Sequence, residues 1–282
     1  MLDRREKNAE IFKDTVHQYR TNNELKSTIK KSISEQLFIG ADESCEISVS
    51  MEKAGDVVVT SAKTFEAGRK YANQGKKVCV LNFASATNPG GGVKNGSSAQ
   101  EESLCRCSTL YPCLNELYEV FYLPHRNAHN ALYNDDCIFT PGVKVFKDDG
   151  DFAETLPQNE WWDVDVITCA APNLRAVPSN FMNPCAGEKA NISKEELREL
   201  LRKRIGRIFE VAIRSKADAL VLGAFGCGAF KNPPEVVASV FAEYTEKYRE
   251  HFDIIEYAVY HRPNEKENYE AFVNAMKKWE KK

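Results

Sequence analysis

The feature that most constrains the fold is an alternation of short apolar segments with longer helical segments. Five segments are rich in Val and Ile, as strands buried on both faces of a sheet tend to be. They are Asp56–Thr60, Lys77–Phe83, Val164–Ala170, Ala219–Ala224 and Ile254–Tyr260. Helices are predicted at about 61–75, 98–122, 193–215, 233–250 and 265–281. This alternation predicts a largely parallel α/β sheet covered by helices on both faces, with ligands bound at the carboxyl ends of the strands.

The remaining segments add to this core without dividing it. Residues 1–36 predict two polar helices broken near Asn22, because their apolar residues recur at helical spacing. Residues 140–163 are rich in Pro, Gly and Asp and are interpreted as an excursion from the sheet. Neither an internal repeat nor an interdomain linker is apparent. We therefore expect a single domain over residues 1–282, with a helical N-terminal extension over residues 1–40.

Composition excludes several classes of protein. Hydrophobic residues make up 43% and charged residues 28%, as in ordinary globular domains. The net charge of −3 offers no broad basic surface for nucleic acid, and no run reaches the ~20 apolar residues that span a bilayer. Nine scattered cysteines favour reduced thiols over a disulfide framework. We expect a cytoplasmic protein without a signal peptide, a membrane partner or a sequence-specific nucleic-acid partner.

Two glycine-rich loops follow two of the predicted strands. The first glycine loop, residues 88–93, reads Asn-Pro-Gly-Gly-Gly-Val, and the second, residues 223–230, reads Gly-Ala-Phe-Gly-Cys-Gly-Ala-Phe. Glycines let backbone N–H groups approach a ligand, and a following helix N-terminus adds donors for an anion. Both loops could also be tight turns without a ligand. Their spacing matches neither a P-loop nor the dinucleotide fingerprint.

Two carboxylates, Glu101 and Glu102, come directly after the first glycine loop at an expected helix start. A structural explanation exists, since Ser98 and Glu101 have capping-box spacing and acidic residues favour a first turn. The chemical alternative is cleavage of a sugar acetal. That reaction needs a proton for the departing oxygen and stabilisation of an oxocarbenium-like centre, and carboxyl groups perform both tasks in glycosidases.

The order of these residues resembles the signature of the poly(ADP-ribose) glycohydrolases, especially the compact microbial type built on a macrodomain. Three glycines, Gly90 to Gly92, are followed by seven residues and then by Gln100-Glu101-Glu102. Further stretches resemble the same family, so the likeness runs from about residue 55 to 260. These stretches are 81–89 (LNFASATNP), 140–149 (TPGVKVFKDD), 168–173 (TCAAPN) and 223–233 (GAFGCGAFKNP).

The resemblance implies a macrodomain-like three-layer α/β/α fold with a mixed, mostly parallel sheet. It also implies hydrolysis of the ribose–ribose bond of poly(ADP-ribose), or of ADP-ribosylated proteins, without a metal or cofactor. Glu102 would be the catalytic acid/base, and Glu101 would bind ribose hydroxyls and position the sugar. The implied ADP-ribose-binding residues come from both loops and the helix start: Asn88, Gly90, Gly91, Gly92, Val93, Gln100, Gly226, Cys227, Gly228, Ala229 and Phe230.

Other functions remain open at this stage. A macrodomain could bind ADP-ribose without cleaving it, although a pure reader has no need of a second carboxylate. Hydrolysis could instead act on mono-ADP-ribose. A structural zinc site could form from Cys105, Cys107, Cys113, His125 and His129, but no Cys-x-x-Cys pair is present and buried thiols explain the cysteines better. Cys227 has no His near it in sequence, which argues against a nucleophilic role.

Overall fold

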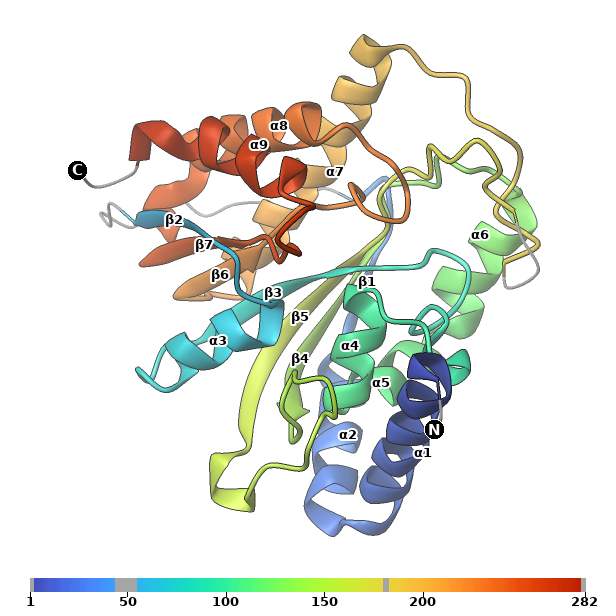
Figure 1. Cartoon of the computed structure of the whole chain (residues 1–282), viewed down its shortest axis with the longest axis vertical. Helices are drawn as coiled ribbons and strands as arrows, with labels where there is room; N and C mark the ends of the chain where they lie inside the picture. Colours follow the sequence, from blue (N-terminus) through green and yellow to red (C-terminus); the bar gives the residue numbers. More distant parts are fainter. Residues whose placement is uncertain (1–2, 44–54, 180–182, 280–282) are drawn as a thin grey trace.

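The computed structural model describes residues 3–43, 55–179 and 183–279, and its centre is one seven-stranded sheet (Figure 1). The strand order is β1-β4-β5-β3-β6-β7-β2. The bounds are β1 Leu37–Ile39, β2 Asp56–Thr60, β3 Val78–Phe83, β4 Cys137–Val145, β5 Trp162–Cys169, β6 Ala219–Leu222 and β7 Ile254–Ala258. Strands β5, β3, β6, β7 and β2 run parallel, and β4 and β1 add two antiparallel pairings at one edge. The sheet is therefore mixed and mostly parallel, as expected.

Helices cover both faces of this sheet. In Figure 1, α7, α8 and α9 lie on one side, and α3, α4 and α5 lie on the other. The bounds are α1 Arg4–Thr21, α2 Asn23–Glu35, α3 Thr64–Ala72, α4 Gln100–Cys107, α5 Leu110–Glu116, α6 Leu123–Ala128, α7 Lys194–Arg214, α8 Pro234–Tyr248 and α9 Glu267–Met276. The predicted capping box of α7 is present, with Ser193 and Glu196 capping each other.

The alternation of side chains along the central strands produces the three layers. In β3, Cys79 and Leu81 belong to the core beneath α7, α8 and α9, whereas Val78 and Val80 belong to the core beneath α3 and α4. Since successive strand residues point to opposite faces, apolar residues at every position serve both cores. This explains why the central strands read as continuous apolar runs.

The sequence did not predict β1 or β4, and its interpretation of residues 140–163 as an excursion was wrong for the first part. Residues up to Val145 belong to β4, and the chain leaves the sheet only afterwards. The register shifts between Thr140 and Val143, and Gly142 has φ +61°. A bulge of this kind accommodates Pro141, which cannot donate a ladder hydrogen bond. The Pro-Gly pair therefore indicated a bulge within a strand.

The helix predicted at 98–122 is broken into separate elements. α4 ends at Cys107, Ser108 forms an isolated bridge to Val145, and α5 begins at Leu110. Pro112 lies in the first turn of α5, where a missing N–H is tolerated. The expected capping box at the start of α4 is also absent, because the N-cap is Ala99 and it makes no side-chain cap hydrogen bond.

The two N-terminal helices are confirmed, and α1 packs against the loop that carries the glycine signature. Asn8 Nδ2 donates to the carbonyl oxygen of Gly96 at 3.1 Å, and the Thr15 hydroxyl donates to the carbonyl oxygen of Arg106 at 2.6 Å. Lys147, whose side chain is buried, forms an ion pair with Asp14 at 2.6 Å. These contacts connect α1 to the first glycine loop region, to α4 and to the chain after β4.

Two sequence expectations concern cysteines and membranes. The eight cysteines within the described ranges form no disulfide, and seven of them are buried; Cys45 lies outside those ranges. None of the described helices has the length and apolar character needed to cross a bilayer.

Candidate active site

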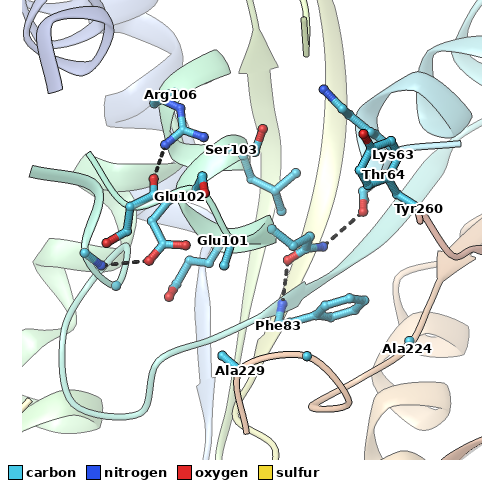
Figure 2. Close-up of a pocket in the computed structure, with 18 of the residues that line it drawn as sticks. Lys63, Thr64, Phe83, Glu101, Glu102, Ser103, Arg106, Ala224, Ala229 and Tyr260 are labelled. Atoms are coloured by element: carbon cyan, nitrogen blue, oxygen red, sulfur yellow. Dashed lines mark hydrogen bonds between the residues drawn. The ribbon is translucent and has the colours of Figure 1, made fainter. Parts of the chain in front are cut away.

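A cavity of about 1200 Å³ opens at the carboxyl ends of the parallel strands. Both glycine loops line it, as do the first turn of α4 and the chain that follows β7. Figure 2 shows Glu101 and Glu102 of α4 on one side, Ala224 and Ala229 of the second glycine loop opposite, and Lys63 with Tyr260 at one end. The topology explains this convergence, because the carboxyl ends of parallel strands meet at one edge of a sheet.

The first glycine loop holds the two carboxylates through its backbone. The N–H of Gly92 donates to Glu102 Oε1 at 2.9 Å, and the N–H groups of Ser85 and Gly90 donate to Glu101. Gly91, at φ +57°, leaves no room for a side chain, since a Cβ atom there would lie 2.6 Å from Glu102 Oε1 and 3.1 Å from Glu101 Oε2. The consecutive glycines therefore bind protein carboxylates closely, and these particular N–H groups are not free for phosphate.

The two carboxylates have different surroundings. Glu101 is 3% exposed, and its oxygens accept from Asn82 Nδ2 at 3.3 Å and from the Ser85 N–H at 2.8 Å. Glu102 is 8% exposed and lines the cavity; its Oε2 is buried and has no hydrogen-bond partner among the described residues. A buried polar atom without a partner is rare and calls for an explanation. Of the pair, Glu102 has the oxygen whose hydrogen-bonding capacity is unused among the described residues.

Burial and the neighbouring Glu102 carboxylate raise the pKa of Glu101 well above 4.5. The folded chain therefore binds this proton more tightly than the unfolded chain does. The resulting contribution to stability is fully present below pH 4.5 and is lost as the pH rises through the folded-state pKa. We expect the free energy of unfolding of the parent to fall more steeply than that of Glu101→Gln as the pH rises above 4.5, as urea titrations would measure. Parallel pH profiles for the two proteins would contradict the assignment.

The second glycine loop, unlike the first, has several backbone N–H groups without a hydrogen-bond partner in the described parts of the chain. Within the described parts of the chain, the backbone N–H groups of Gly226, Gly228, Ala229 and Phe230 make no hydrogen bond. Asn232 secures the loop, because its Nδ2 donates to the carbonyl oxygens of Pro172 at 2.7 Å and Gly226 at 3.1 Å. Free N–H groups on a fixed loop form a binding site for an anion. This loop is therefore the candidate diphosphate site.

The structure brings most of the sequence-predicted site residues to the cavity. Those that line it are Asn88, Gly91, Gly92, Gln100, Glu101, Glu102, Gly226, Gly228, Ala229 and Phe230. Gly90, Val93 and Cys227 do not line it. Val93 is fully buried in the core, and the Cys227 N–H donates to the Ala224 carbonyl oxygen within its own turn. Gln100 has a structural role, because its amide connects α4 to β3 and α3. Its Oε1 accepts from the Phe83 N–H, and its Nε2 donates to the Leu81 carbonyl oxygen and to Thr64 Oγ1.

Sequence reasoning missed two groups of residues beside the carboxylates. Asn82 Nδ2 donates to Glu101 Oε1 at 3.3 Å and to Thr168 Oγ1 at 3.2 Å. Asn82 on β3 and Thr168 on β5 are register partners in the sheet. The signal was a polar residue near the end of each buried apolar strand. Beside Glu102 on the same helix, Ser103 donates a hydrogen bond to the buried side chain of Asp149, and Lys63 donates to the carbonyl oxygen of Asp149. No spacing in the sequence indicated this second group, since its members come from three distant segments.

The alternative chemistries find little support in the geometry. Within the described residues, no group of three or more His, Cys, Asp or Glu side chains forms a metal site. Cys105, Cys107 and Cys113 are buried, and His125 packs edge-on against Phe121. Burial raises the pKa of the Cys227 thiol to about 12, so it is not a ready thiolate nucleophile.

Comparison with known proteins identifies the family and the fold. The family model of the microbial-type PARG catalytic domain matches residues 6–148. The poly(ADP-ribose) glycohydrolase of Thermomonospora curvata is 28% identical over 96% of this chain and 100% of that chain, with a TM-score of 0.81. Its complex with the inhibitor ADP-HPD gives 27% identity and a TM-score of 0.78, over 96% and 99% of the two chains. No curated protein matches the sequence significantly.

A third structure is that of the Deinococcus radiodurans enzyme in complex with ADP-ribose. It is 32% identical over 89% of this chain and 97% of that chain, with a TM-score of 0.73. The fold is thus macrodomain-like, and its cavity is lined by a glycine-held carboxylate pair and by a loop with free N–H groups among the described residues. The chain belongs to the microbial-type poly(ADP-ribose) glycohydrolase family. The family match begins at residue 6, so it includes the N-terminal helices that the sequence resemblance left out.

Proposed function

We propose that this chain hydrolyses the ribose–ribose glycosidic bond of poly(ADP-ribose), releasing ADP-ribose, with Glu102 as the acid/base. The observation that carries the proposal is that Glu102 lines the cavity, that its Oε2 has no hydrogen-bond partner among the described residues, and that its Oε1 is held by the Gly92 N–H. This arrangement fixes the direction of the carboxyl group and leaves one oxygen for proton transfer. General acid–base catalysis requires both conditions.

In this mechanism Glu102 gives a proton to the departing ribose oxygen while positive charge develops at the neighbouring sugar carbon. A water molecule then attacks that carbon and passes its proton back to Glu102. Glu101 positions the sugar by accepting from its hydroxyl groups, and Asn82 and Ser85 keep Glu101 in place. The fixed protein groups orient the substrate, and orientation supplies much of the rate enhancement.

The strand order suggests the direction in which the terminal ADP-ribose lies. The carboxylates fix the reacting ribose over β3, and the free N–H groups of the second glycine loop bind the diphosphate over the adjacent β6. Continuing in the same direction leads to β7 and β2. There Val259 and Tyr260, which follow β7, line the cavity; together with Phe83 at the end of β3 and Ala224 after β6, they offer apolar surface for the adenine.

We also propose that residues 1–282 act as one glycohydrolase domain, in which α1 is part of the catalytic unit. The support is the hydrogen bond from Asn8 to Gly96 and the bond from Thr15 to Arg106. A Cβ atom on Gly96 would lie 1.9 Å from the carbonyl oxygen of Arg5, which shows how closely α1 packs here.

The test is incubation of the purified protein with automodified poly(ADP-ribosyl)ated protein in EDTA, followed by chromatography of the released products. We expect free ADP-ribose to accumulate. If none were released while ADP-ribose still bound in calorimetry, the chain would be a reader of ADP-ribose. Release only from mono-ADP-ribosylated protein would assign it to the mono-ADP-ribosyl hydrolases.

A second prediction tests the diphosphate site. A Cβ atom at Gly228 meets nothing within 4 Å, so Gly228→Ala is expected to leave the melting temperature unchanged. Its methyl group would stand among the free N–H groups and keep the diphosphate away. We expect the Kd for ADP-ribose to rise about 10-fold, or ~1.4 kcal/mol. Gly40→Ala, outside the cavity lining and with only ordinary contacts, is the matched control. An unchanged Kd for Gly228→Ala would remove the second glycine loop from the binding site.

A further inference from the structure

Asn88 lies at the start of the first glycine loop, close in the chain to the glycines that hold the carboxylates. Its carbonyl oxygen accepts from the Gly91 N–H at 2.9 Å, and Gly91 packs against both Glu101 and Glu102. Asn88 also lines the cavity. In the proposed function the reacting ribose lies at Glu102, so the hydroxyl groups of that sugar are suitable partners for the Asn88 side chain.

Two contacts define the orientation of the Asn88 amide. Its Oδ1 accepts from Arg126 Nη1 at 3.0 Å, and its Nδ2 donates to Thr87 Oγ1 at 3.2 Å. The guanidinium group of Arg126 has donors only. The Thr87 hydroxyl donates its own hydrogen to Asn183 Oδ1 at 2.6 Å, so it accepts from Asn88. Turning the amide over would lose both hydrogen bonds, and the amide therefore has one preferred orientation.

Arg126 reaches Asn88 from behind the cavity wall. It is half-buried on the short helix α6 and does not line the cavity. The neighbouring His125 is buried and packs edge-on against the rings of Phe121 and Tyr133, which anchors α6. The same Nη1 of Arg126 also donates to the carbonyl oxygen of Thr87 at 3.2 Å. Arg126 therefore contacts both the backbone of the loop and the amide of Asn88.

The charge of Arg126 is directed at neutral oxygens. Its only partners in the described part of the chain are the two oxygens of Thr87 and Asn88, whereas Arg204 pairs with the carboxylate of Asp135 at 3.0 Å. A hydrogen bond from a charged donor is stronger than a neutral one, and it polarises the group that accepts it. The guanidinium therefore fixes the amide and strengthens its N–H groups as donors.

We propose that Arg126 is a positioning residue that orients the Asn88 amide to bind a hydroxyl group of the reacting ribose. This inference rests on the proposed function, which places that ribose at Glu102. Since the amide oxygen only accepts and the amide nitrogen only donates, the bond to the sugar depends on which end of the amide faces it. Without Arg126 the amide can turn over and exchange its two ends. Arg126 itself touches no substrate.

The test measures the Kd for ADP-ribose and for ADP, which lacks the distal ribose, by calorimetry on the full chain. Arg126→Met keeps the apolar stem and removes the donors. We expect it to raise the Kd for ADP-ribose about 5-fold, as for loss of one hydrogen bond, and to leave the Kd for ADP within about 2-fold of the parent value. Arg126→Lys keeps a charged donor and should recover part of the affinity.

A double-mutant cycle with Asn88→Ala separates positioning from a general structural role. If Arg126 acts through the Asn88 side chain, Arg126→Met should have no further effect on the Kd for ADP-ribose once that side chain is removed. Arg214→Met is the matched control, because Arg214 is exposed at the end of α7 and does not line the cavity. It should leave both Kd values at the parent level.

Each other outcome overturns a proposal. An unchanged Kd for ADP-ribose in Arg126→Met would remove Arg126 from the account, and equal rises for ADP and ADP-ribose would show that it supports the whole cavity. A further loss in the Asn88→Ala background would assign its effect to the Thr87 carbonyl oxygen. Failure of the parent to release ADP-ribose from the polymer would refute the proposed function, whereas the binding cycle would still decide whether Arg126 acts through Asn88.

Discussion

Glu102→Gln is expected to lower kcat on poly(ADP-ribose) by roughly 10²–10⁴-fold, the usual contribution of general acid–base catalysis. The amide keeps the size of the side chain, and its oxygen can still accept from the Gly92 N–H at 2.9 Å. It cannot exchange a proton with the leaving oxygen. Since we propose that the diphosphate binds at the second glycine loop, the Kd for ADP-ribose should remain within about 2-fold of the parent value. Single-turnover kinetics and calorimetry measure the two quantities.

Glu243→Gln is a suitable comparison for the same chemical change. Glu243 is on α8, pairs with Arg198 and Arg202, and does not line the cavity. Its substitution should leave kcat unaltered. Parent-level turnover by Glu102→Gln would refute the assignment of the acid/base. A large loss of ADP-ribose affinity in that variant would show that Glu102 acts chiefly in binding.

Gly91→Ala is expected to lower kcat by about 10²-fold or more, because displacing a catalytic group by about 1 Å has effects of this size. The new Cβ atom would lie 2.6 Å from Glu102 Oε1 and 3.1 Å from Glu101 Oε2, so both carboxylates must move. The substitution also places a non-glycine residue at φ +57°, which is unfavourable by about 1–2 kcal/mol. Both turnover and the melting temperature should fall.

Gly75→Ala separates these two effects. Gly75 has φ +75°, similar to that of Gly91, but a Cβ atom there meets nothing within 4 Å, and the residue does not line the cavity. It should lose a comparable amount of stability and keep the parent kcat. If Gly91→Ala lost stability alone, as Gly75→Ala should, the steric argument about the carboxylates would be wrong.

Much of the fold could be predicted because the central strands are buried on both faces. Their apolar runs, such as Val78–Phe83, stand out from the amphipathic helices on either side. The antiparallel strands β1 and β4 at the edge were missed because neither has a long, uninterrupted apolar run. β1 has only three residues, and β4 contains a Pro-Gly bulge that a local reading assigns to a loop. Whether such residues bulge within a ladder or leave the sheet depends on the partner strand, which local sequence does not specify.

Most of the residues expected at the site line the cavity, but their hydrogen bonds were only partly predicted. Three glycines beside two carboxylates were expected to cradle a phosphate, but the N–H groups of Gly90 and Gly92 bind Glu101 and Glu102. The free donors lie in the second glycine loop. Spacing alone cannot separate these cases, because an N–H group binds whichever oxygen tertiary packing brings to it.

The central claim is that the two glycine loops hold one ADP-ribose with its reacting ribose at Glu102. A crystal structure of Glu102→Gln in complex with ADP-ribose tests it most directly. We predict the diphosphate against the N–H groups of residues 226–230 and the side-chain amide of residue 102 within about 3 Å of the oxygen on the reacting carbon. A distal ribose bound elsewhere, or a diphosphate held by the first glycine loop, would contradict the account.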